Sequence, residues 1–103
     1  SHHCWLVVFT AFQRSAEKGY APAQYNLAVM YAEGRASAVD GTKAVEWYRA
    51  AARQGSPAAN VALARLHLAG KWVAMDRERA KVYLNQAAKD GSKEAETELK
   101  ANF

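Results

Sequence analysis

The sequence predicts an all-α fold, an α-solenoid of stacked antiparallel helix pairs. The first observation behind this prediction is a self-similarity at a spacing of 36 residues, a period typical of solenoids. The second is that each period holds two segments with apolar residues at helical spacing. The third is that the recurring residues are glycines, alanines and large apolar residues, which set turns and helix contacts rather than a reaction. The matching sets are Gly19, Gly55 and Gly91; Ala23, Ala59 and Ala95; Leu27, Leu63 and Leu99; Gly34 and Gly70; Asp40 and Asp76; and Ala44 and Ala80.

The composition fits one small domain or a piece of a longer array. The chain has 103 residues, half of them hydrophobic, and a net charge of +4. Its basic residues are scattered and form no stripe, so we expect no nucleic-acid partner. The longest apolar run, residues 4–9, is far shorter than the ~20 residues of a membrane-spanning helix. The single cysteine, Cys4, permits neither an intrachain disulfide nor a four-ligand zinc site.

The first full period, residues 19–54, is expected to form one helix pair. Its first helix covers residues 22–33, because proline is tolerated at a helix start and Gly34 can end the helix in a left-handed conformation. After a short loop, Asp40 is the expected N-cap of a second helix that runs to about residue 54. The predicted apolar stripes are Ala23, Leu27, Met30 and Tyr31 in the first helix and Ala44, Trp47, Tyr48, Ala51 and Ala52 in the second.

The second full period, residues 55–90, repeats this order. Ser56 and Pro57 open its first helix, and Asp76 is the expected cap of its second. Residues 91–103 are predicted to form the first helix of a further repeat, or a C-terminal cap. The corresponding apolar positions are Ala59, Leu63, Leu66 and His67, followed by Ala80, Tyr83, Leu84, Ala87 and Ala88.

Residues 1–18 fit the period less well. We interpret them as a remnant of a purification tag followed by the second helix of an incomplete preceding repeat, with residues 8–16 in helical register. A copper or nickel site at His2 and His3 is the alternative to the tag. Residues 4–12 are strongly apolar and need a cover, which the rest of a longer array, another copy or the chain's own second unit could provide. Self-association through this segment is therefore a hypothesis.

The run from Ala23 to Tyr31, followed by Gly34, Asp40, the pair Trp47 and Tyr48, and Gly55, resembles the Sel-1-like repeat. This family is related to the tetratricopeptide repeat and has a period of about 36 residues. The resemblance covers residues 19–101 in two registers. Two departures stand out. The family usually has a second glycine two residues after the helix-ending one, where this sequence has Ala36 and Trp72, and His67 stands where the first repeat has Tyr31.

The resemblance implies a non-catalytic scaffold or adaptor that mediates protein–protein interaction, without a cofactor. Members of the family are common in bacterial envelopes and secretion, which slightly favours an envelope or periplasmic setting, and in protein degradation at the eukaryotic endoplasmic reticulum. The alternatives are a regulatory or accessory subunit that acts by assembly, or a metal-binding or enzymatic module. An enzyme would need a concave site with converging, pKa-shifted groups.

Partner-binding residues follow from the way tetratricopeptide-type stacks use the first helix of each unit to line their concave face. The positions that the apolar stripe leaves open are expected to contact a protein or peptide, and Trp72 is a candidate loop anchor unless it folds over its own hairpin. Asp40 and Asp76 are interpreted as caps, and His67 as a core replacement for tyrosine. No catalytic or metal-binding residue is expected. The candidate concave-face residues are Tyr25, Val29, Glu33, Val61, Arg65 and Leu68.

Overall fold

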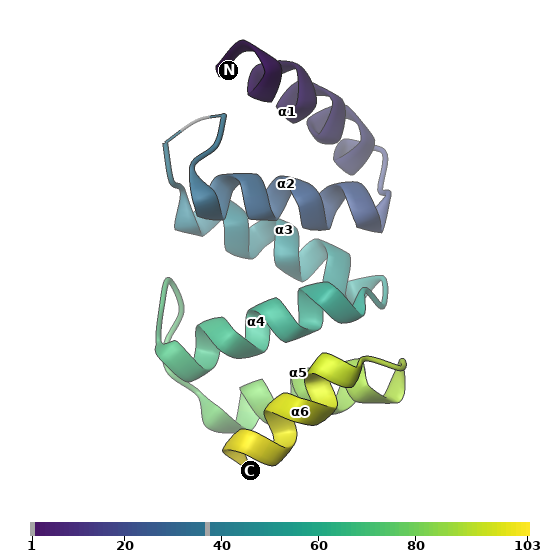
Figure 1. The fold of residues 1–103 in the computed structure, drawn as a ribbon, viewed down its shortest axis with the longest axis vertical. Helices are drawn as coiled ribbons and strands as arrows, with labels where there is room; N and C mark the ends of the chain where they lie inside the picture. Colours follow the sequence, from purple (N-terminus) through teal and green to yellow (C-terminus); the bar gives the residue numbers. More distant parts are fainter. Residues whose placement is uncertain (1, 37) are drawn as a thin grey trace.

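The computed structural model describes residues 2–36 and 38–103, with side chains from residue 4 onward. This part of the chain is all α-helical and contains no strand. The helices stack into an elongated molecule of 42 × 24 × 20 Å, with the two termini at opposite ends (Figure 1). The helices in chain order are α1 (His2–Glu17), α2 (Ala21–Glu33), α3 (Gly41–Arg53), α4 (Pro57–Ala69), α5 (Arg77–Lys89) and α6 (Lys93–Asn102).

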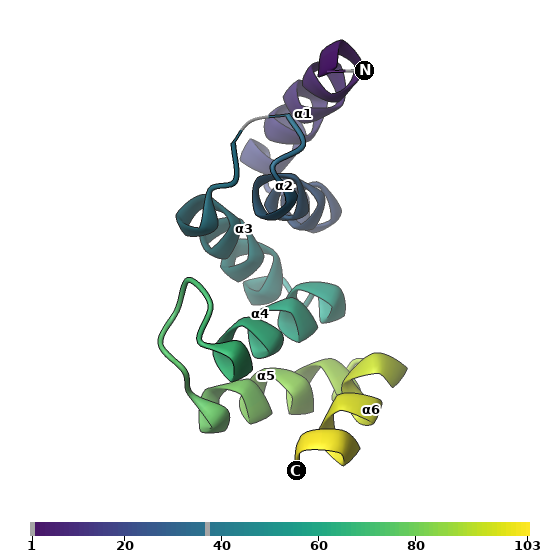
Figure 2. The same ribbon diagram turned by 60° about the vertical axis from the view of Figure 1, so that its left-hand side comes forward.

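Successive helices are antiparallel and pack against each other along the stack. The connections α2–α3 and α4–α5 are long loops on one edge of the stack, and the other three connections are short turns on the opposite edge (Figures 1 and 2). The pairs α2 with α3 and α4 with α5 are the two predicted helix–loop–helix units, and the predicted fold class is therefore confirmed. The N-terminal helix begins at His2 and so extends beyond the predicted segment 8–16.

The ends of the helices follow from local chemistry that is the same in both units. Gly34 and Gly70 have φ values of 66° and 65°, a left-handed conformation that glycine adopts without cost, and their N–H groups donate to Met30 O and Leu66 O. Asp40 and Asp76 each accept a hydrogen bond from the backbone three residues later, as the predicted caps should. The two loops therefore start and finish alike.

The core consists of two clusters of different size. The larger cluster joins α1 to α4 and contains Leu27, Leu63 and the aromatic rings of Tyr31 and Tyr48. The smaller cluster lies between α4, α5 and α6. Its buried members are Val61, Leu84 and four alanines, namely Ala64, Ala80, Ala87 and Ala95. Alanine at these positions allows the helices to approach closely.

Candidate functional site

A groove between α2 and α4 brings together five of the seven predicted binding residues. It encloses about 380 Å³, with Tyr48 of α3 among its lining residues and Lys71 and Trp72 of the second long loop at one side. We call it the α2–α4 groove. The predicted residues that line it are Tyr25, Val29, Glu33, Arg65 and Trp72, and the others are Ala32, Tyr48, Ala62, Leu66 and Lys71.

Aromatic and aliphatic side chains form much of this groove. The ring centroids of Tyr25 and Tyr48 lie 5.8 Å apart at an angle of 54°. Burial, and to a smaller extent the neighbouring Tyr25 and Glu33, raises the pKa of Tyr48 to about 12. Tyr48, like an ordinary tyrosine, keeps its phenolic proton at neutral pH, and the charged side chains that line the groove are Glu33, Arg65 and Lys71.

Two predicted contact residues do not lie in the groove. Val61 is only 3 % exposed and belongs to the smaller core cluster, and Leu68 packs against the same cluster. The expectation that Val61 is open to a partner is therefore wrong. The cluster that covers Val61 is formed with α5, which contributes Leu84, and with α6, which contributes Ala95 and Leu99.

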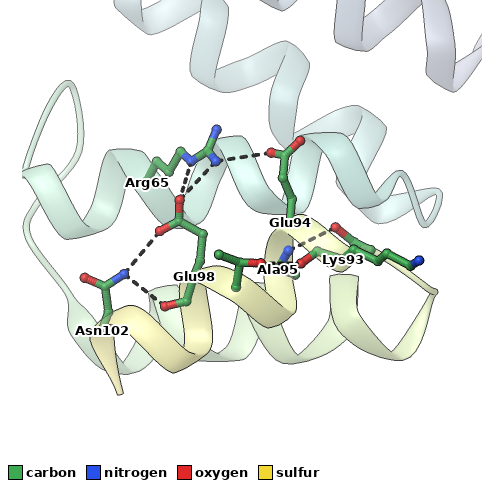
Figure 3. A network of polar contacts seen from close by, with 8 residues as sticks. Arg65, Lys93, Glu94, Ala95, Glu98 and Asn102 are labelled. Carbon is green, nitrogen blue, oxygen red and sulfur yellow. Dashed lines mark hydrogen bonds and ion pairs between the residues drawn. The ribbon is translucent and has the colours of Figure 1, made fainter.

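Arg65 lies beside the groove but is also bound to α6. Its guanidinium donates from Nε to Glu98 at 3.0 Å and from Nη2 to Glu94 at 3.1 Å, while Asn102 donates to Glu98 from the next turn (Figure 3). Arg65 and Glu94 are both more than half exposed, so their ion pair contributes little stability by itself, whereas the Glu98 side chain is only 25 % exposed. The network fixes the direction of the Arg65 side chain more than it holds the fold together.

Trp72 lies against the preceding unit rather than over its own hairpin. A Cβ atom on Gly41, the first residue of α3, would collide with the Trp72 ring, and this contact requires glycine there. The ring remains 37 % exposed, with the Lys71 ammonium 4.6 Å from its centre. Trp72 has a φ of 61°, which is rare for any residue except glycine, and this conformation accounts for the glycine that the family usually has at this position.

The remaining candidate groups are far apart or serve the fold. Cys4 is exposed on α1, whereas His67 is buried on α4 with Nδ1 at 3.0 Å from Ala74 O. No group of three or more possible metal ligands occurs among the described residues, and the side chains of His2 and His3 lie outside them. In the same part of the chain, no helix has the length and apolar character needed to cross a membrane.

The architecture and groove define an α-helical repeat protein, and comparison with known proteins identifies the family. The Sel1 repeat model matches residues 21–56 and 57–92, which is most of the chain. The chain therefore belongs to the Sel1 repeat family, as the resemblance indicated. Proteins of this family are generally scaffolds for protein–protein interaction.

Solved structures agree with this family. The protective antigen c5321 of uropathogenic Escherichia coli, which displays an SLR fold, is 33 % identical with a TM-score of 0.79 over 82 % of this chain. A Sel1 repeat protein from Oxalobacter formigenes is 30 % identical with a TM-score of 0.82 over 84 % of this chain. The matches cover only 18 % and 36 % of those two longer chains. A search among curated proteins gave no significant match.

Proposed function

We propose that this chain is a non-catalytic scaffold that binds a protein or peptide partner in the α2–α4 groove. The observation that carries the proposal is the convergence of Tyr25, Val29 and Trp72, which come from two different repeats, around one depression. The groove lies between the first helices of the two units, which form the concave face in related stacks. A regulatory or accessory subunit that acts by assembly would use the same surface.

The chemistry of the groove suits a partner with apolar side chains. Tyr25 and Trp72 are aromatic residues of the type that dominates binding energy at interfaces, and Tyr48 offers a neutral hydroxyl group. A space of about 380 Å³ is large enough to accommodate one or two side chains of a bound segment. Glu33 and Arg65 supply charges that can orient the partner.

Affinity capture with matched variants tests this proposal. Val29→Arg places a charge in the groove, and Val82→Arg makes the same change at an exposed position of α5. The wild type and Val82→Arg should retain the same protein from a lysate, and Val29→Arg should lose it. Glu33→Arg, at an exposed groove position, repeats the test without affecting the core. Undiminished capture by both groove variants would refute the proposal.

Self-association through α1 is a second candidate, favoured by exposed apolar side chains. Trp5, Leu6, Val7 and Val8 are between 37 % and 59 % exposed, whereas Phe9 packs its ring edge-on against Tyr31 at 5.3 Å. The outer part of the segment is therefore surface, and its inner part is core. Sedimentation at about 10 μM should show a dimer that Val7→Glu converts to a monomer. A monomeric wild-type protein would dismiss self-association.

A further inference from the structure

A second groove lies between α3 and α5, on the side of α4 that faces away from the α2–α4 groove. At 100° per residue, Asn60 and His67 lie on one face of α4, and Ala62 and Leu66 lie about 100° to 160° around the helix from them. This second groove encloses about 450 Å³. We call it the arginine groove. Its lining residues are Arg49, Ala52, Arg53, Asn60, Arg79 and Tyr83.

Three arginines and no carboxylate line this groove. Arg79 has one distant partner, Asp76 at 3.9 Å, and both side chains are largely exposed. In the part of the chain that the structure describes, neither Arg49 nor Arg53 forms an ion pair. Arg49 is only partly exposed as a residue, so its side chain lies along the protein surface at the groove. An incoming carboxylate would therefore meet positive charge that the protein itself leaves unneutralised.

An adjoining cavity continues the groove and adds two carboxylates to its arginines. It shares Arg49 and Arg79 with the arginine groove and adds Glu46, Asp76 and His67. His67 is 4 % exposed, and its Nδ1 lies 3.0 Å from a carbonyl oxygen, which can only accept. In the neutral imidazole this contact requires the hydrogen on Nδ1, and the buried Nε2, which has no hydrogen-bond partner in the described structure, is then an acceptor. At this end of the groove the carboxylates of Glu46 and Asp76 stand beside Arg49 and Arg79, whereas the other end is lined by arginines without a carboxylate.

The repeat itself does not require the arginines. One period earlier, Gln13, Glu17 and Lys43 occupy the positions of Arg49, Arg53 and Arg79, and that interval carries no such cluster. The packing of one helix pair on the next is therefore satisfied without three arginines. Their convergence is a property of this one interval, and it needs another explanation than the fold.

We propose that the arginine groove binds an acidic peptide segment, with its carboxylates on Arg49, Arg53 and Arg79 and a lysine or hydroxyl side chain toward Glu46 and Asp76. This surface is separate from the α2–α4 groove and does not depend on it. A nucleic-acid backbone fits less well, because its next phosphates along the groove would meet the two carboxylates. The charges of a peptide, in contrast, can alternate as those of the groove do.

A titration followed by NMR tests the proposal on the whole chain. The probe is the acetylated, amidated peptide Glu-Glu-Ala-Ser-Lys, and the matched probe replaces both glutamates with glutamine. The acidic peptide should shift the backbone signals of Arg49, Arg53, Arg79 and Tyr83, and its affinity should fall when NaCl rises from about 0.05 to about 0.5 M. The glutamine peptide should leave these signals in place.

Matched variants decide whether the arginines act specifically. Arg49→Gln should weaken binding of the acidic peptide about tenfold, and Arg14→Gln, the same charge change on α1, should change it less than about twofold. Circular dichroism confirms that both variants are folded. Equal weakening by both variants, the absence of shifts at the arginines, or tighter binding of a short oligothymidine to the same residues would each overturn the proposal.

Discussion

The space between α2 and α4 and the space between α4 and α6 occupy equivalent places in the repeat but are filled differently. In the first space, which we call the open interval, Tyr25 and Val29 line the α2–α4 groove. In the second space, which we call the closed interval, the equivalent residues are Val61, which is buried, and Arg65, which forms ion pairs with two glutamates of α6. Leucines and alanines at equivalent positions of the repeat form the core beside both intervals. The comparison teaches that one helical frame can present an open or a closed interval, depending on a few side chains that the period does not specify.

The largest expected effect tests whether the equivalent core leucines of the two repeats contribute equally to stability. Leu27 and Leu63 are equivalent and have no exposed surface, so Leu27→Ala and Leu63→Ala should each reduce the free energy of unfolding by about 3 kcal/mol. Urea unfolding followed by circular dichroism measures both losses. Val82→Ala at an exposed site is the control and should cost less than about 0.5 kcal/mol. A loss below about 1 kcal/mol for only one leucine would show that the frames differ.

The next prediction concerns the loop wall of the open interval. Gly41→Ala should destabilise the protein by about 2 kcal/mol, because the new Cβ displaces the Trp72 ring. In a Trp72→Ala background the same change should be neutral or stabilising by up to about 1 kcal/mol, since alanine is the better helix residue. A double-mutant cycle on unfolding free energies gives this coupling. Additive effects would mean that Trp72 does not rest on Gly41.

The floor of the open interval should make stability depend on alkaline pH. The pKa of Tyr48 is raised from 10.0 to about 12, so the folded protein holds this proton more tightly than the unfolded chain does. The resulting stabilisation is complete below pH 10 and is lost as pH rises from 10 to about 12, by about 2 kcal/mol. Comparing wild type with Tyr48→Phe over this range isolates the effect. An identical slope for both proteins would contradict the buried tyrosine.

The smallest expected effect belongs to the closed interval. Arg65→Gln removes both ion pairs to α6 and should cost about 0.5 to 1 kcal/mol at low salt, because two of the three charges, Arg65 and Glu94, are more than half exposed. The difference from wild type should shrink at about 1 M NaCl. Lys89→Gln, on an exposed face of α5, provides the baseline. A loss of several kcal/mol would show that the network holds α6 in place.

The sequence predicted the fold well because its signals are local. Glycines at left-handed ends, aspartate caps and apolar stripes act within one helix or one turn, and residues such as Gly34, Asp40 and Leu27 lie where the period placed them. Leu99, by contrast, matches Leu27 in register but is only partly buried, at the edge of the smaller core cluster.

The surfaces were harder to predict because they depend on contacts between units. Nothing near Val61 in the sequence predicts that α5 and α6 will bury it, and Trp72 contacts Gly41, which lies 31 positions earlier. The arginine groove was missed for the same reason. Arg49 and Arg79 are scattered along the chain, and only the stacking of α3 and α5 brings them together.

The central claim is that the open interval, and not the closed one, receives the partner. Photo-crosslinking from single positions tests this most directly, with a benzophenone amino acid in place of Tyr25 in the open interval or of Glu94 in the closed one. Both positions are accessible enough for the probe, since Glu94 is 68 % exposed and Tyr25 lines the groove. Irradiation of cells that produce the protein should join one partner to the Tyr25 position and none to the Glu94 position. Equal crosslinking at both positions, or at Glu94 alone, would contradict the account.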